Sequence, residues 1–256
     1  MHQIDLNCDL GELDGDEGLE LDAAILPSIS SANVACGFHA GSAARLRQLA
    51  ILCREHGIDF GAHPGYPDRA GFGRVVIPMA PQRITDIVTI QIILATAIAE
   101  SEGIRLSHVK PHGALYNLAA EDAEIAAAFA AAIRRACPAA RLVGLAGSRL
   151  ITAGKAIGLS TTSEFFADRN YCAGGSLVPR DQSDAVLHDA HDIAQRIVAL
   201  HRTGRMRTTA GTEIPVVAET VCVHSDTHNA VEIATTLRRV LEENGIVICR
   251  PGNHCA

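Results

Sequence analysis

The chain has 256 residues, of which 48% are hydrophobic and 20% charged, as expected for a globular protein that can bury a sizeable core. Aromatic residues make up 4% and tryptophan is absent, so that core must consist mainly of Ala, Leu, Ile and Val. The formal net charge of -7 and the lack of a Lys/Arg-rich stripe argue against a nucleic-acid partner.

Cysteine spacing and apolar patterns indicate the compartment. Eight cysteines are scattered without a CxxC pair, which excludes a zinc ribbon or a redox CxxC motif. The chain starts on a strand-like pattern at residues 4–6 without an export signal, and no apolar run approaches the length that spans a bilayer. We therefore expect a cytoplasmic protein with free thiols and no membrane partner.

Short strand-like runs alternate with longer segments of helical periodicity along the chain. Strands are predicted near residues 3–7, 31–38, 59–62, 106–109, 141–146, 160–166, 216–223 and 246–249. Helices are predicted near residues 43–56, 83–101, 121–136, 148–157, 184–201 and 228–243, and four are expected to end at Gly57, Gly103, Gly158 and Gly245. This alternation predicts a largely parallel sheet, and without an obvious linker it predicts one domain over residues 1–256.

Two irregular loops interrupt the alternation, and each follows a predicted strand. Residues 62–74 and 168–180 are too rich in Gly and Pro for a helix, yet they carry charged and aromatic side chains. Long loops of ordered composition are usually functional. Arg74 and Arg180 close these loops, and they are candidates either to clamp an anion or to form surface salt bridges.

Titratable and amide side chains follow the ends of most predicted strands. The carboxyl ends of parallel strands meet on one face of a barrel or open sheet, so these side chains are expected to form one site. The residues are Asn7, Asp9, Glu12, His39, His63, Lys110, His112, Glu164, Asp168, His224 and Asp226.

Several of these residues also have ordinary structural explanations. Asp9 and Glu12 could cap the segment that follows their strand. A lone histidine such as His39 is often structural, but histidines at several strand ends favour a shared function. Lys110 lies between an apolar strand and Pro111, which favours an inward-pointing cation suited to a phosphate or carboxylate.

Other reactive side chains are better explained by structure. Cys36 precedes Gly37-Phe38-His39, but a small buried thiol is a simpler interpretation than a nucleophile. His188 and His191 have a spacing that could hold a metal, yet an exposed helical face explains them better. The terminal His254 and Cys255 are expected to be frayed.

Five motifs distributed over nearly the whole chain strongly resemble the LamB/YcsF family. They are Asp5–Glu12 (DLNCDLGE), Asn33–Gly41 (NVACGFHAG), Gly61–Asp68 (GAHPGYPD), Val109–Asn117 (VKPHGALYN) and Glu164–Arg169 (EFFADR). The resemblance implies a seven-stranded (β/α)7-type barrel, akin to the polysaccharide deacetylase fold, with the eighth predicted strand as an accessory. It also implies the A subunit of an ATP-dependent 5-oxoprolinase, which opens 5-oxo-L-proline to L-glutamate together with subunits B and C.

The motifs and the strand ends together define the candidate site. Its candidate catalytic residues are Asp9, Glu12, His39, His63, Lys110 and His112. Its candidate residues for binding the small-molecule substrate or the nucleotide are Asn7, Asn33, Arg74, Tyr116, Glu164, Asp168, Arg169, Arg180, His224 and Asp226.

Opening a lactam is uphill, which suggests phosphoryl transfer from ATP to the lactam oxygen followed by attack of water. Lys110 and an arginine would neutralise the phosphate charge, Asp9 and Glu12 would hold Mg²⁺, and His63 or His112 would act as acid or base. The chain contains neither GxxxxGK[ST] nor GxGxxG after its first strand, so ATP is not held by a common motif.

Two other hypotheses remain open. One is a metal-dependent deacetylase-like amide hydrolase with Asp9, His63 and His112 as ligands. The other is a protein that only binds substrate or organises its partners. Three positions beside the expected site depart from the family pattern, and they are Ser42, Ser225 and His228.

Overall fold

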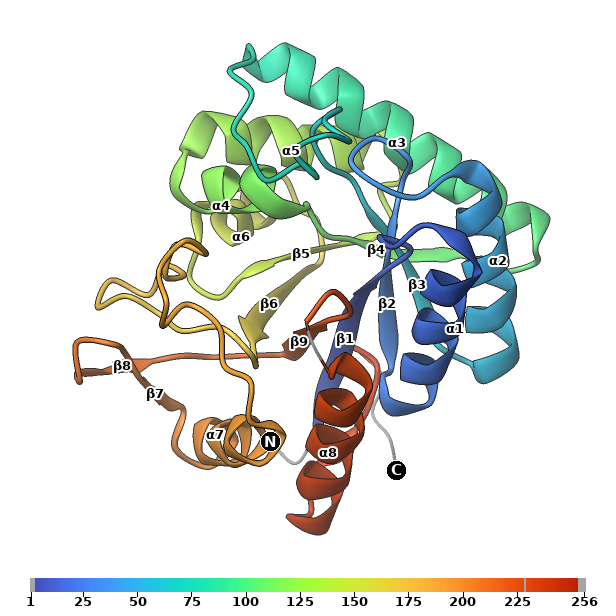
Figure 1. Ribbon diagram of the computed structural model, residues 1–256. Helices are drawn as coiled ribbons and strands as arrows, with labels where there is room; N and C mark the ends of the chain where they lie inside the picture. Colours follow the sequence, from blue (N-terminus) through green and yellow to red (C-terminus); the bar gives the residue numbers. More distant parts are fainter. Residues whose placement is uncertain (1–2, 228, 253–256) are drawn as a thin grey trace.

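The computed structural model describes residues 3–227 and 229–252, and a closed barrel of parallel strands forms its centre (Figure 1). The barrel closes because β9 pairs with both β6 and β1. Around the barrel the strands are β1 (Gln3–Leu10), β2 (Ser31–Ala35), β3 (Asp59–His63), β4 (Leu106–Val109), β5 (Arg141–Leu145), β6 (Thr161–Phe166) and β9 (Thr220–His224). The predicted (β/α)7-type barrel is confirmed.

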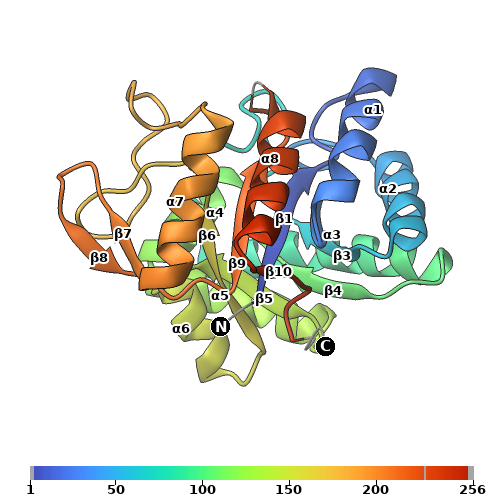
Figure 2. The ribbon, with the colours of Figure 1, turned by 90° about the horizontal axis from the view of Figure 1, so that it is seen from below.

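Helices cover the outside of the barrel. They are α1 (Gly15–Ile25), α2 (Ala43–His56), α3 (Pro81–Ser101), α4 (Gly113–Glu121), α5 (Ala123–Ala136), α6 (Arg149–Ala156), α7 (Ala190–Thr203) and α8 (Ala230–Glu243). Figure 2 shows α8 between α7 and α1, and both neighbours contact it. Buried apolar residues of the strands and helices form one cluster, so the main core lies between the barrel and this outer layer.

Local sequence explains several helix ends. The Ser42 side chain accepts a hydrogen bond from the Arg45 amide and begins α2, while Gly57 ends that helix with a positive φ of 66°. The Asp122 carboxylate caps α5 by accepting bonds from the amides of Glu124 and Ile125. At these ends small polar residues and glycine satisfy free backbone groups.

Short elements lie outside the barrel. They are the 3-10 helix η1 (Leu26–Ser28), the antiparallel pair β7 (Arg205–Arg207) and β8 (Glu213–Pro215), and the strand β10 (Val247–Ile248). β10 pairs with the start of β1, which confirms the prediction that the eighth strand is an accessory.

The structure corrects several predicted elements. The predictions omitted α1 and α4, and α1 carries two glycines that weaken a helical signal. The helix expected over 184–201 begins only at Ala190, where Asp189 caps it. The strand expected over 216–223 begins at Thr220, and the β7–β8 pair was also not predicted.

Two further expectations need correction. By length and composition, α3 is long and apolar enough to cross a membrane, contrary to the expectation for apolar runs. Nearly half of this stretch is buried, and α3 packs against α5 and α2 in the outer layer. Cys249 is disulfide-bonded, so the expectation of free thiols is wrong at that position.

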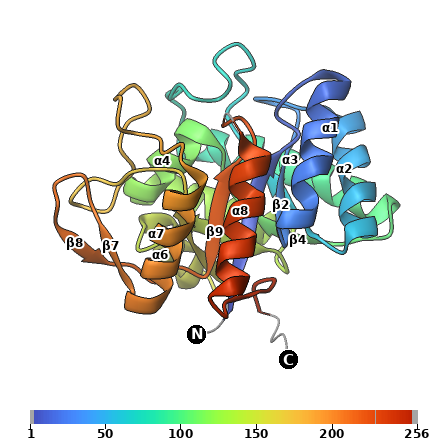
Figure 3. The same cartoon turned by 60° about the horizontal axis from the view of Figure 1, so that its bottom comes forward.

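Alternating residues of β1 face different environments. Leu6, Cys8 and Leu10 are buried in the apolar core, whereas Asn7 and Asp9 contact polar side chains inside the barrel. The loops that follow β3 and β6 project from the end of the barrel at which the strands terminate (Figure 3). That end brings strand-end side chains and both irregular loops together.

Candidate active site

A cavity of about 390 Å³ opens at the carboxyl ends of the strands. Among the residues predicted for the site, those that line it are Asp9, Glu12, His63, Arg74, Lys110, His112, Tyr116, Arg169, Arg180 and His224. The remaining predicted residues lie behind this wall and contact its members; they are Asn7, Asn33, His39, Glu164, Asp168 and Asp226. All the predicted residues thus belong to one connected group.

Lys110 is a fully enclosed cation at the floor of the cavity. Its Nζ donates to Oδ1 of Asp9 at 2.8 Å, lies 2.9 Å from Oε1 of Glu164, and is 3.0 Å from Sγ of Cys222. Although burial opposes the charge, Asp9 and the other anionic neighbours raise the pKa of Lys110. Only 1% of the residue is exposed, so its charge interacts mainly with these buried partners.

Asp9 is held from several sides. The register of the barrel places it beside Asn33 of β2 and His224 of β9. Asn33 Nδ2 donates to Asp9 Oδ1 at 2.8 Å, and the Ser225 hydroxyl donates to the Asp9 carbonyl at 2.6 Å. Burial alone would raise the pKa of Asp9, but the charges of His63 and Lys110 hold it well below its usual range.

Polar contacts continue below Asp9 inside the barrel. His108 Nε2 donates to Asn33 Oδ1 at 2.7 Å, which orients the amide that contacts Asp9. Burial lowers the pKa of His108 to about 3, so this ring is neutral. A Cβ on Gly61 would lie 2.2 Å from His108 Nε2, so glycine on β3 makes room for the ring.

The Glu12 carboxylate lies close to three histidines. Its Oε1 lies 2.8 Å from Nδ1 of His112, 3.3 Å from Nε2 of His39 and 3.6 Å from Nε2 of His63. His39 stacks on His112 with ring centres 3.7 Å apart. Burial lowers the pKa of His39 to about 4, so its neutral ring donates to Glu12.

Carboxylates dominate the potential around His63. Burial favours the neutral ring, yet the charges of Asp9 and Glu12 raise the pKa of His63. For Glu12, burial is likewise outweighed by His112 and His39, and its pKa lies well below the usual range. This corner of the cavity therefore attracts positive charge.

His224 forms a second His–carboxylate unit at the end of β9. Its Nδ1 lies 3.0 Å from both carboxylate oxygens of Asp168, and the Thr227 hydroxyl donates to the same carboxylate at 3.0 Å. The charge of His224 outweighs burial and lowers the pKa of Asp168. Because Nδ1 is bound to Asp168, Nε2 is the ring nitrogen left for a ligand in the cavity.

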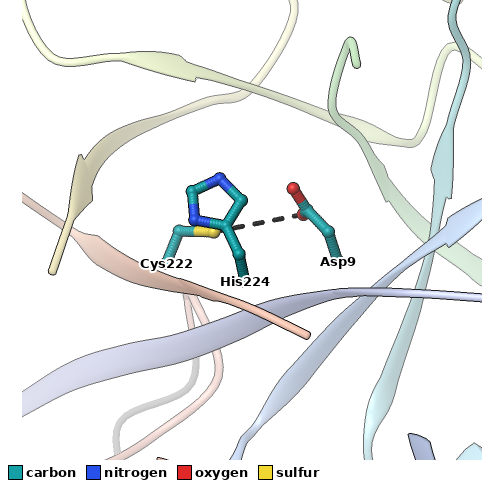
Figure 4. Close-up of side chains that lie close together, drawn as sticks. All are labelled: Asp9, Cys222 and His224. Carbon is teal, nitrogen blue, oxygen red and sulfur yellow. Dashed lines mark hydrogen bonds between the residues drawn. The ribbon is translucent and has the colours of Figure 1, made fainter. Parts of the chain in front are cut away.

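Figure 4 shows Asp9, Cys222 and His224 close together on β1 and β9. Cys222 Sγ lies 4.0 Å from Asp9 Oδ1. Burial and the Asp9 charge raise the pKa of the Cys222 thiol well above its usual value, so it remains protonated. Cys222 was not among the predicted residues, although it precedes His224 by two residues and therefore shares its face of the strand.

The two irregular loops form the rim of the cavity. Arg74 and Arg180 come from different loops and both pair with Asp226. Arg169 is buried, and its guanidinium donates to the carbonyls of Ala185 and Val178. The rim thus presents two partly exposed guanidinium groups above the buried carboxylates.

Aromatic and amide side chains complete the walls, and several were not predicted. Phe166 stacks on His224 with ring centres 5.2 Å apart and lies 5.0 Å from the Lys110 ammonium. Gln91 of α3 fixes Gly65 by bonds to both its amide and its carbonyl. Phe166 could have been found because it alternates with Glu164 and Asp168, whereas nothing near Gln91 in the sequence indicated its contact.

The structure also places the side chains for which a structural explanation was preferred. Burial raises the pKa of Cys36 to about 12, which supports a structural thiol. His188 and His191 are exposed. Of the departures from the family pattern, Ser42 caps α2 and Ser225 bonds Asp9, while His228 lies outside the described residues, as do His254 and Cys255.

Known proteins match this chain over nearly its full length. Residues 4–255 match the model of the LamB/YcsF family. A protein of Staphylococcus carnosus that is named as the A subunit of 5-oxoprolinase is 44% identical, over 98% of this chain and 99% of its own length. The protein of the same name from Shouchella clausii is 46% identical, over 99% of this chain and 100% of its own.

One solved structure is similar throughout. It is the lactam utilization protein of Thermus thermophilus, which superposes with a TM-score of 0.89 at 38% identity. The match covers 96% of this chain and 98% of that one. The barrel and its loops are therefore shared with a protein named for lactam use.

Proposed function

Because this chain belongs to the LamB/YcsF family, we propose that it is the A subunit of an ATP-dependent 5-oxoprolinase, which converts 5-oxo-L-proline to L-glutamate. The observation that carries this proposal is the near full-length identity with bacterial proteins named as that subunit. The name implies an enzyme of several subunits, and we propose subunits B and C as its partners in the cytoplasm. The continuous sheet from β1 to β10 supports one domain over residues 1–256.

The chemistry must activate a weak electrophile. We propose that ATP, accompanied by Mg²⁺, is the co-substrate of the complete enzyme and phosphorylates the lactam oxygen. Water then adds to the ring carbon bearing that oxygen, and the ring C–N bond breaks to leave an acyl phosphate. A second water displaces the phosphate from that carbon, which gives the carboxylate. The nitrogen takes up a proton and becomes the amine of glutamate.

His224 fits the proton-transfer role best. It lines the cavity and Asp168 binds its Nδ1, which leaves Nε2 to take a proton from water or give one to the ring nitrogen. His63 and His112, the residues predicted for this role, each hydrogen-bond a backbone carbonyl with one ring nitrogen and face Glu12 with the other. We therefore assign proton transfer to His224.

Arg74 and Arg180 are the cations suited to a phosphate or carboxylate, because their guanidinium groups are partly exposed at the rim. Lys110 is already saturated by Asp9 and Glu164. Asp9 and Glu12 do not fit the predicted Mg²⁺ site, since the Lys110 ammonium occupies Asp9 Oδ1 and imidazole nitrogens surround Glu12, whereas Mg²⁺ prefers oxygen ligands. No step is assigned to Mg²⁺ at these residues.

Reconstitution tests the proposal. The chain is combined with its candidate subunits B and C, and glutamate release from 5-oxoproline with ATP is measured. We expect glutamate, ADP and phosphate in equal amounts only when this chain is present. A parallel mixture with the Shouchella clausii relative in place of this chain serves as the positive control. Glutamate in that mixture but none with this chain would contradict the proposal.

A further inference from the structure

One carboxylate oxygen and two ring nitrogens converge at one corner of the cavity. They are Oε1 of Glu12, Nε2 of His63 and Nδ1 of His112, and all three lie within 4.8 Å of one another. The Glu12 oxygen is 2.8 Å from the His112 nitrogen and 3.6 Å from the His63 nitrogen, and the two nitrogens are 3.1 Å apart. The three residues come from separate strand ends and line the cavity.

The opposite ring nitrogens determine where the hydrogens are. His63 Nδ1 lies 2.8 Å from the Lys110 carbonyl, and His112 Nε2 lies 2.8 Å from the Phe72 carbonyl. A carbonyl oxygen only accepts, so each of these nitrogens must carry a hydrogen. Histidines that bind a metal are neutral, and a neutral imidazole has one N–H, so in that state the nitrogens that face Glu12 carry lone pairs. Without a metal, a proton between Glu12 and the rings takes the place of the ion.

Two lone pairs and a carboxylate oxygen in mutual contact repel one another unless a cation lies between them. We propose that Glu12, His63 and His112 bind a divalent transition-metal ion of the zinc type. Ligand atoms about 2.1 Å from a tetrahedral ion are about 3.4 Å apart, and those around an octahedral ion about 3.0 Å. The three observed separations scatter around these values.

The surroundings support the three ligands. The backbone carbonyls of Lys110 and Phe72 fix the tautomer and orientation of both rings, as outer partners of metal-binding histidines usually do. His39 donates to Glu12 and stacks on His112, which orients the carboxylate. The cavity on the open side leaves room for a further ligand, as in catalytic rather than structural zinc sites.

A second group of possible donors, Asp9, Cys222 and His224, lacks these properties. The Lys110 ammonium already binds Asp9 Oδ1 and Cys222 Sγ, so positive charge is present there. His224 directs its Nδ1 to Asp168. Lysine therefore neutralises this second group, whereas no lysine in the described part of the chain pairs with Glu12. Two imidazole nitrogens and one carboxylate also suit zinc better than Mg²⁺, which prefers oxygen ligands.

The test measures metal binding without turnover, so it is independent of the 5-oxoprolinase activity. The full chain is stripped with a chelator, titrated with Zn²⁺ by calorimetry, and loaded with Co²⁺ to record the visible spectrum. We expect one Zn²⁺ per chain and a Co²⁺ spectrum of low coordination number. Glu12→Gln and His112→Ala should each weaken binding by more than the roughly 10–100-fold that loss of an outer partner of a metal ligand costs.

Matched controls use the other candidate donors. Cys222→Ser removes a donor from the lysine-filled group, and the double variant His188→Ala/His191→Ala removes an exposed histidine pair. Both should retain one tight Zn²⁺, and circular dichroism verifies that every variant is folded. If the wild-type chain holds no stoichiometric metal, a shared proton holds the three residues together and the proposal is wrong. Unchanged binding in folded Glu12→Gln and His112→Ala would overturn it equally.

Discussion

The Lys110 ammonium lies 2.8 Å from Oδ1 of Asp9 at the floor of the cavity, and the same nitrogen is 2.9 Å from Glu164. One buried cation thus balances two buried carboxylates. Such an arrangement costs desolvation, and it is tolerable only while every charge keeps its partner. Lys110 is consequently a positioning residue for Asp9, rather than a free cation awaiting phosphate.

Lys110→Met should therefore reduce stability strongly. Removing one partner of a buried ion pair costs about 3–5 kcal/mol, and here it leaves two carboxylates exposed to each other. Urea unfolding followed by circular dichroism measures the loss. In Lys110→Met/Glu164→Gln one of those charges is absent, so part of the stability should return. Additive effects of the two substitutions would show that Lys110 and Glu164 are not coupled.

Asp168→Asn should slow the reaction without unfolding the protein. The amide no longer binds the Nδ1 hydrogen of His224 through both oxygens, so the ring loses its fixed tautomer. Because general acid–base catalysis contributes roughly 10²–10⁴-fold, kcat for glutamate release should fall by about that range with little change in KM. Thr227→Val removes another bond to the same carboxylate and should have a much smaller effect. Equal losses in both variants would point to a purely structural Asp168.

Asp5 should make stability depend on pH. It accepts bonds from Ser30 and Ser31 inside the barrel, but burial raises its pKa to about 6. The unfolded value is about 3.9, so between about pH 4 and 6 the native state binds more protons than the unfolded state. The resulting stabilisation is complete below that window and is lost as the pH rises through it.

Comparison with Asp5→Asn isolates this contribution, because the amide does not titrate. From pH 4 to pH 7 the free energy of unfolding of the wild-type chain should fall by about 2 kcal/mol relative to the variant. Urea unfolding at both pH values measures the difference. If the free energies of unfolding of the two proteins differ by the same amount at both pH values, Asp5 has an ordinary pKa.

Gly61→Ala should destabilise the barrel from inside. The new methyl group would lie 2.2 Å from His108 Nε2, the atom that orients Asn33. Overpacking of this kind costs about 1–3 kcal/mol. Gly174→Ala is the matched control, because an added Cβ there meets nothing within 4 Å. Thermal unfolding gives the melting temperatures of the two variants. Equal melting temperatures would mean that His108 moves aside at no cost.

Sequence periodicity was sufficient for the barrel because each barrel strand and most helices carry local signals. The alternation of Asn7 with Asp9 on β1 also places polar groups on one face of the strand, and this follows from the sequence alone. By contrast, α4 begins directly at Gly113, and glycine has a poor helix propensity. Local patterns thus located the strand ends but not every helix between them.

Contacts between distant residues could not be predicted. Whether Lys110 faces solvent or two carboxylates depends on the closure of β9 against β1, which no local pattern encodes. The Phe72 carbonyl that orients His112 belongs to an irregular loop, where backbone direction is set by tertiary packing. The candidate residues were therefore predictable as a set, whereas their pairings required the fold.

The pairing of β1 with β9 also sets an order of events during synthesis. Asp9 is among the first residues made, yet its neighbours Cys222 and His224 follow more than two hundred residues later. Contacts between residues so far apart in the sequence form slowly, because closing the long loop between them costs entropy before the contacts stabilise the chain. A nascent chain that stops before Thr220 leaves β1 without this partner and Lys110 without its thiol neighbour. Assembly of the cavity thus waits for the last strand of the barrel.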